Sequence, residues 1–113
     1  MNAADFRRIC LAQPQAEEKS HFEQPDFRVG GKIFATMTPG ETRGTVILTP
    51  EQQEMLVEAE PKVFQPVAGG WGKSGSTQVF FEHADEPTLE SAIRMAWIKR
   101  APKKLLKSLG IAN

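Results

Sequence analysis

The strongest constraint on the fold is a Gly30-Gly31 pair flanked by two stretches in which apolar and polar residues alternate. Phe27 and Val29 are the apolar positions before the pair. Those after it, at the same spacing of two, are Ile33, Ala35 and Met37. This alternation is typical of strands with one buried face, and two adjacent glycines accommodate the positive φ values of a tight primed turn. The pattern predicts a β-hairpin over residues 26–37.

Further extended segments are predicted on both sides of this hairpin. A polar connection over residues 38–44 leads into a third strand at residues 45–48, and the segment around residues 20–22 is left open as a fourth. After a helix, a short edge strand is predicted at residues 63–64 and an extended segment over residues 77–82. Because these strands follow one another without crossover helices, the sheet is predicted to be antiparallel.

Three helices are predicted from apolar spacing and from signals at their ends. The first contains residues 6–10, with its apolar positions three and four apart. The second begins at Thr49-Pro50, where Thr49 can cap, Pro50 suits the first helical position and Gln52 completes a capping box. The third is interrupted at Pro102 and has the apolar stripe Leu89, Ala92, Ile93, Ala96 and Trp97.

Length and composition limit the class of protein. The chain has 113 residues, enough for one domain spanning residues 1–113, and its 40% apolar and 25% charged content is that of an ordinary globular domain. The predicted fold is therefore α+β, a two-layer sandwich in the order α-β(3)-α-β(2)-α with the helices on one face of the sheet. No apolar run exceeds four residues and no secretory pattern is visible, so we expect no membrane contact and a cytoplasmic location.

The sequence contains no recognisable catalytic or metal-binding pattern. Its one cysteine, Cys10, lies on an apolar stripe and is expected to be a buried core thiol. His21 and His83 each lack a second ligand at helical spacing. The Gly72-Lys73-Ser74 segment resembles part of a nucleotide-binding loop, but the required earlier glycine is replaced by Val67 and a strand is predicted to follow. We expect a glycine-rich hairpin there, and a non-enzymatic protein without cofactors.

Charge is distributed unevenly along a chain whose formal net charge is zero. Residues 1–90 contain eight basic and fourteen acidic side chains, whereas residues 91–113 contain six basic side chains and no acidic ones. Basic residues stabilise the carboxyl-terminal end of a helix, but six exceed that need. Two interpretations remain open: this basic segment binds an anionic partner, or it pairs with acidic side chains of the same or a neighbouring molecule.

The segment from Glu23 to Ala35, which includes Pro25, Phe27-Arg28-Val29 and Gly30-Gly31-Lys32-Ile33-Phe34, resembles the hairpin of the MmcQ/YjbR family. The Thr49-Pro50-Glu51 helix start, the Gly70-Trp71 loop and the basic closing helix follow in the order of that family. The resemblance implies an α-β-α-β-α sandwich and DNA binding through a double-wing arrangement of two β-loops. By position these would be the Gly30-Gly31 turn and the connection over residues 38–44. Residues 72–76 extend the loop beyond the family pattern.

The favoured hypothesis is therefore a protein that binds double-stranded DNA through phosphate contacts, with little sequence discrimination. Its candidate contact residues are Arg28, Lys32, Arg43, Trp71, Lys73, Lys99, Arg100, Lys103 and Lys104. Phe34 and Phe80 are out of phase with the buried face, so they are candidate exposed aromatics. The alternative hypothesis is a module that binds another protein or a second copy of itself through the open sheet face or edge.

Overall fold

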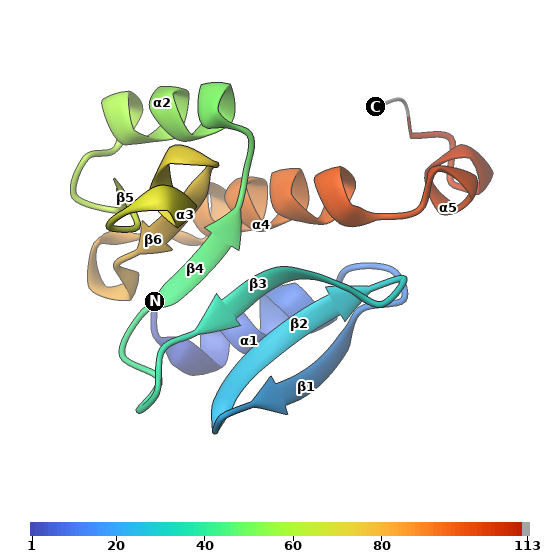
Figure 1. Ribbon diagram of the computed structural model, residues 1–113, viewed down its shortest axis with the longest axis horizontal. Coiled ribbons are helices and arrows are strands. Elements are labelled where there is room, and N and C mark those ends of the chain that lie inside the picture. Colours follow the sequence, from blue (N-terminus) through green and yellow to red (C-terminus); the bar gives the residue numbers. More distant parts are fainter. Residues whose placement is uncertain (112–113) are drawn as a thin grey trace.

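The computed structural model describes residues 1–111, which form one six-stranded antiparallel sheet with helices packed against it (Figure 1). In chain order the elements are α1 (Ala3–Leu11), β1 (Glu17–His21), β2 (Gln24–Val29), β3 (Lys32–Met37), β4 (Gly44–Ile47), α2 (Pro50–Ala59), β5 (Phe64–Pro66), α3 (Gly70–Lys73), β6 (Ser76–Val79), the 3₁₀ helix η1 (Phe81–His83), α4 (Glu86–Arg100) and α5 (Lys103–Ser108). The predicted α+β class is confirmed.

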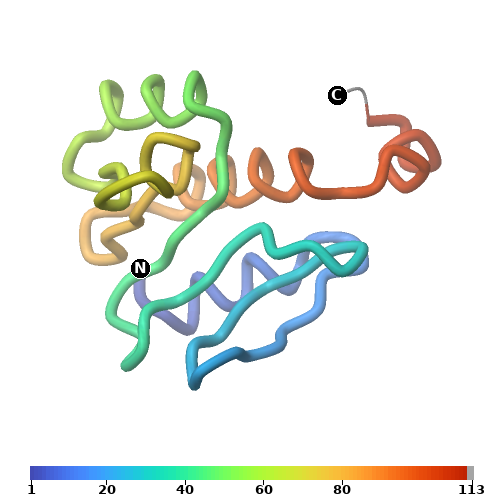
Figure 2. The backbone as a smooth tube through the Cα atoms, in the orientation of Figure 1, coloured from blue at the N-terminus to red at the C-terminus, as the bar shows by residue number. Residues whose placement is uncertain are grey.

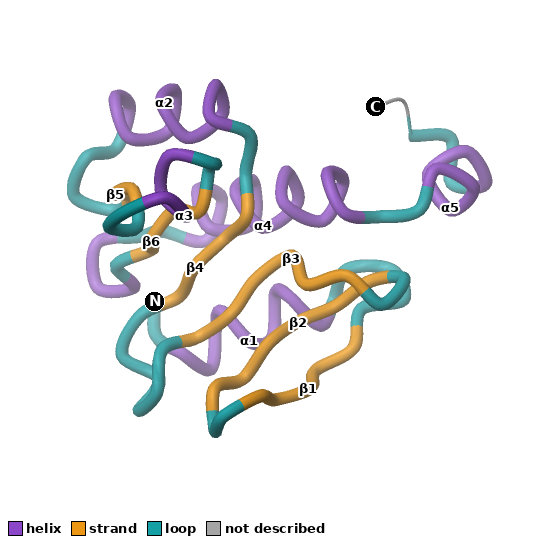
Figure 3. The backbone as a smooth tube through the Cα atoms, viewed as in Figure 1, coloured by secondary structure: helices purple, strands orange, loops and turns teal. Residues whose placement is uncertain are grey.

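The sheet has the order β1-β2-β3-β4-β6-β5, and every neighbouring pair is antiparallel. Helices α1 and α4 lie behind the sheet in the view of Figure 3, and we call this side the inner face. Helix α2 packs against β5 at one edge of the sheet. The segment left open as a fourth strand forms β1, the opposite edge. Its pairing with β2 gives a first run of four strands.

The hairpin forms as predicted, with Gly30 and Gly31 at φ values of +58° and +79°. Its register, however, contains a β-bulge. Phe27 pairs with Ala35 while Arg28 pairs with Ile33, so Phe34 is an extra residue on β3. The bulge turns Phe34 into the core, where it is 0% exposed, and leaves the partly buried Ile33 on the outer face. The expectation that Phe34 is exposed and Ile33 faces inward is therefore wrong.

The glycine-rich segment also differs from its prediction. Residues 70–73 form the single turn of α3 instead of a hairpin. The following strand β6 ends at Val79, and Phe81 lies in η1 instead of continuing the strand. Phe81 is nevertheless buried, because its ring packs 5.3 Å from that of Phe6 on α1.

Capping and apolar burial account for the three longer helices. Thr49 and Gln52 form the predicted capping box at the start of α2, and Asp85 accepts a hydrogen bond from the Thr88 backbone at the start of α4. The predicted apolar stripe of α4 is entirely buried. Cys10 is also fully buried, and this burial raises the pKa of its thiol well above the usual value.

The carboxyl-terminal end of α4 lies beside the β2–β3 turn, as the chain path in Figure 2 shows. A Cβ atom on Gly30 would be only 2.6 Å from Cγ of Pro102, so the proline ring packs directly on the turn. Pro102 separates α4 from α5, as predicted. Within residues 1–111, no helix combines the length and apolar character needed to cross a membrane.

Two glycines hold α3 against the sheet. A Cβ on Gly72 would lie 1.7 Å from the carbonyl oxygen of Val67, and one on Gly75 would lie 1.9 Å from that of Leu48. Gly75 also has a φ of +113°, which side chains rarely adopt. No larger residue fits at either position without moving the backbone. The placement of α3 over the outer face therefore depends on both glycines.

We predict that Gly75→Ala lowers the free energy of unfolding by about 3 kcal/mol or more, because it combines backbone strain with steric overlap. Gly40→Ala is the matched control: Gly40 has a φ of +83° but nothing within 4 Å of an added Cβ, so only the backbone term of about 1 kcal/mol applies. Urea denaturation measures both. Equal losses for the two variants would contradict the packing argument.

Candidate nucleic-acid interface

The outer face of the sheet, opposite α1 and α4, bears a cleft with a volume of about 690 Å³. Ile33 and Ile47 form apolar parts of its wall, and Thr36, Thr45 and Ser76 add hydroxyl groups. These residues lie on β3, β4 and β6, at positions that alternate with buried core residues. The β-bulge at Phe34 is what places Ile33 in the cleft. This part of the cleft is therefore lined by both apolar and hydrogen-bonding groups.

One side of the cleft contains a three-residue polar cluster centred on Asp26. This side chain is 0% exposed and accepts hydrogen bonds from His21 Nδ1 at 2.7 Å, Arg28 Nε at 2.7 Å and Arg28 Nη2 at 3.1 Å. The Arg28 hydrogen bonds, with a smaller contribution from His21, lower the pKa of Asp26 despite its burial. Asp26 is therefore ionised, and a carboxylate can only accept, so His21 carries its proton on Nδ1.

The Asp26 pairing changes the role expected for Arg28. Arg28 lines the cleft as a candidate contact, but its charge is balanced by a carboxylate of the same molecule. A paired guanidinium gives little net attraction for a phosphate. Its contribution is to fix the wall of the cleft, together with His21. This cluster was not predicted, although the alternate positions of Asp26 and Arg28 on one strand indicate that both side chains lie on the same face.

Toward the β2–β3 turn, the cleft is lined by cations that make no ion pair within residues 1–111. Lys32, at the start of β3, and Arg100, at the end of α4, both line it, because Pro102, two residues after Arg100, packs on Gly30, two residues before Lys32. Lys103 and Lys104, on the following helix α5, are both exposed but do not line the cleft. Burial and the nearby Arg100 charge lower the pKa of Lys99 on the same helix end. We call Lys32, Lys99, Arg100, Lys103 and Lys104 the basic end.

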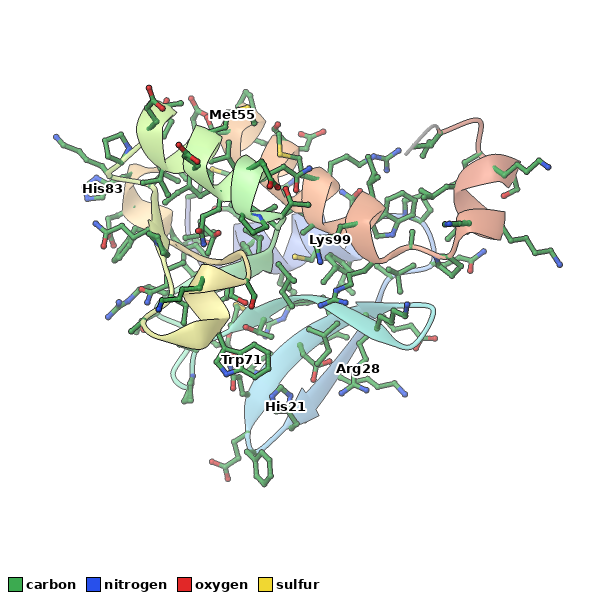
Figure 4. All side chains as sticks on the ribbon, turned by 45° about the horizontal axis from the view of Figure 1, so that its top comes forward. His21, Arg28, Met55, Trp71, His83 and Lys99 are labelled. Carbon is green, nitrogen blue, oxygen red and sulfur yellow. The ribbon has the colours of Figure 1, made fainter. Side chains whose placement is uncertain are left out.

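Trp71 is the largest exposed apolar group at the cleft, with 76% of its surface exposed. It projects from α3, and Figure 4 shows it near His21 of β1, with Arg28 on the neighbouring strand. The other tryptophan, Trp97, is fully buried and donates its indole N–H to the Pro14 carbonyl at 3.0 Å. Trp71 has no such structural role.

Of the predicted contact residues, Arg43 and Lys73 lie outside both the cleft and the basic end. Arg43 precedes β4, where its Nη1 donates to Gln78 Oε1 at 3.0 Å and its guanidinium lies 5.2 Å from the centre of the partly buried Phe80 ring. Lys73 is exposed on α3 but does not line the cleft. The connection over residues 38–43 and the Gly30-Gly31 turn are at opposite ends of β3 (Figure 1). The two β-loops implied as wings therefore do not form one surface.

We predict that Asp26→Asn lowers the free energy of unfolding at neutral pH by about 2 kcal/mol, because charge-assisted hydrogen bonds to His21 and Arg28 are lost. The pKa of Asp26 is lower in the folded than in the unfolded chain, so its stabilising effect is complete above the usual carboxyl pKa and is lost as the pH falls through the folded value. Urea denaturation over a pH series should show the difference between wild type and variant shrinking in acid.

The control for this variant is Glu23→Gln, which changes an exposed carboxylate in the β1–β2 turn and should alter stability by less than about 0.5 kcal/mol. A difference between wild type and Asp26→Asn that stays constant down to acid pH would show that the carboxylate charge contributes nothing.

Comparison with known proteins agrees with this architecture. The YjbR family model matches residues 11–98. No curated protein matches the chain. Among solved structures, the crystal structure of Deinococcus radiodurans protein DR2400, which has a DUF419 domain, superposes with a TM-score of 0.75. That alignment covers 98% of this chain and 89% of the other at 22% identity, so it bears on the fold alone. Because the family model matches well over half of the sequence, this chain belongs to the YjbR family.

Proposed function

We propose that this protein is a non-enzymatic, cytoplasmic nucleic-acid-binding protein that contacts the phosphates of double-stranded DNA with its basic end. The observation that carries the proposal is that the basic end makes no ion pair within residues 1–111 and that two of its cations, Lys32 and Arg100, line the same cleft. The internal pairing considered from the sequence is thus absent from this part of the chain. The exposed cations remain available for an anionic partner.

The side chains of the basic end favour phosphate contacts over base recognition. Lys103 and Lys104 are point charges on flexible stems, which suit phosphate oxygens and do not provide the planar, bidentate geometry that distinguishes bases. Arg100 is the one guanidinium of the basic end, and its Nε is buried without a hydrogen-bond acceptor among the described residues. The Arg100 side chain also lines the cleft, where its guanidinium can donate to a phosphate oxygen. We therefore propose binding with little sequence discrimination.

The second candidate function is self-association, and the charge on α2 is the observation that favours it. Its exposed surface includes Glu51, Glu54 and Glu58 around Met55, which is 50% exposed. This surface is complementary in charge to the basic end of a second molecule. Pairing through the edge strand β1 is disfavoured, because charged side chains on an edge strand oppose strand addition. Light scattering distinguishes the candidates: a strictly monomeric protein counts against self-association.

We predict that Lys103→Glu with Lys104→Glu weakens binding to a short DNA duplex about tenfold or more at low salt, to a similar extent for unrelated sequences. Fluorescence anisotropy at two salt concentrations is the measurement. With about five phosphate contacts, the wild-type affinity should fall more than a hundredfold between about 50 and 200 mM salt. The variant should show a shallower dependence, by about one unit of the logarithmic slope for each lost contact.

Lys62→Glu is the matched control, because Lys62 is an exposed lysine between α2 and β5 and outside the basic end. It should retain most of the wild-type affinity when compared with the single Lys104→Glu variant. Absence of duplex binding by the wild type at low salt would refute the proposal, and an equal loss in both single variants would show that only overall charge matters.

A further inference from the structure

The cleft contains groups that contacts to a duplex backbone do not use. Trp71 presents most of its indole to solvent over a recess lined by Ile33 and Ile47. A backbone phosphate makes no favourable contact with an aromatic ring or with apolar walls. A nucleobase, in contrast, can stack on the ring and be covered by the apolar walls. In a duplex the bases are stacked on one another and cannot enter such a recess.

Cationic groups lie in the same cleft as this aromatic ring. Lys32 and Arg100 belong both to the cleft lining and to the basic end, so the two surfaces are continuous. The buried Nε of Arg100 has no acceptor among the described residues. An aromatic stacking surface beside unpaired cations is the combination by which proteins bind unpaired nucleotide strands.

His21 supplies a polar group close to Trp71 (Figure 4). Because Asp26 holds its Nδ1–H, the opposite nitrogen of the neutral ring, Nε2, is an acceptor without a donor among the described residues. Nε2 can therefore accept a hydrogen bond from an exocyclic amino group or ring N–H of a base. The Asp26 cluster thus fixes a polar group in orientation beside the stacking surface.

The β1–β2 turn adds a second exposed aromatic residue at this end of the sheet. Phe22 is 96% exposed and its ring centre lies 6.2 Å from that of His21. Phe22 and Glu23 have φ values of +50° and +62°, a conformation usually taken by Asn and Gly in two-residue turns. A bulky residue in this conformation is strained, and packing does not compensate for the strain because the side chain is in solvent.

From these observations we propose that the outer-face cleft binds an unpaired nucleotide strand, with a base stacked on Trp71 and its phosphate toward Lys32 and Arg100. This inference rests on the proposed nucleic-acid function and makes it more specific. The ligand is a duplex with a single-stranded extension: the duplex backbone contacts the basic end, and the unpaired strand enters the cleft and continues toward Phe22.

The test compares a blunt duplex with the same duplex carrying a thymidine overhang of about six nucleotides. The wild type should bind the overhang duplex about tenfold more tightly or better, since stacking of one base alone accounts for such a factor. Trp71→Ala should abolish this gain, so that the variant binds the overhang duplex no more tightly than the blunt duplex. Met55→Ala, which removes another exposed apolar side chain, should keep the gain.

Intrinsic fluorescence provides an independent readout, because Trp97 is buried and Trp71 is exposed. The overhang duplex should quench the emission of the wild type, and it should leave the emission of Trp71→Phe unchanged. Equal binding of blunt and overhang duplexes, or a gain that survives in Trp71→Ala, would overturn the inference while the proposed duplex binding stands. Failure of the wild type to bind either duplex would remove both.

Discussion

The burial of one face of α4 against the inner side of the sheet is the interaction on which the fold and the candidate interface both depend. Leu89, Ile93 and Trp97 are each 0% exposed, and burying a side chain of this size contributes about 2 kcal/mol. An exposed ion pair contributes at most about 1 kcal/mol. Apolar packing therefore determines the position of the carboxyl-terminal end of α4 relative to the sheet. Since Arg100 is its last residue and Pro102 packs on Gly30, the same packing carries the basic end to the cleft.

Features set by neighbouring residues could be predicted from the sequence. The Gly30-Gly31 turn, the Thr49 cap and the buried stripe of α4 each depend on chemistry within a few positions of the chain, and each is confirmed. The bulge at Phe34 could not be predicted in this way, because an inserted residue in one strand is defined only by the register of its partner. The β1–β2 turn could not be predicted either, because its central residues, Phe22 and Glu23, are not the usual turn residues.

The candidate site likewise has features that could be predicted from the sequence and features that depend on the tertiary fold. The excess of positive charge after residue 90 is a property of the sequence and needs no structure to be seen. Whether each cation is paired is a property of the tertiary fold: Arg28 is balanced by Asp26, Arg43 is bound to Gln78, and the cations of the basic end are unpaired within residues 1–111. The two β-loops suggested by the family resemblance are likewise separated by the length of β3. Position along the chain alone did not reveal this separation.

The cleft is electrostatically asymmetric, and this asymmetry would orient the nucleotide strand that we propose it binds. At the end beside the β2–β3 turn, Lys32 and Arg100 add positive charge that nothing in the described chain balances, whereas the adjacent Arg28, opposite Ile33, is balanced by the buried Asp26 carboxylate toward the other end. A phosphate is attracted to the first end and gains little at the second. The second end instead offers Trp71 and the oriented His21 ring, which suit a neutral, planar base. In the proposed site Asp26 would therefore have two effects: it holds His21 and Arg28 in place, and it confines the attraction for phosphate to the end lined by Lys32 and Arg100.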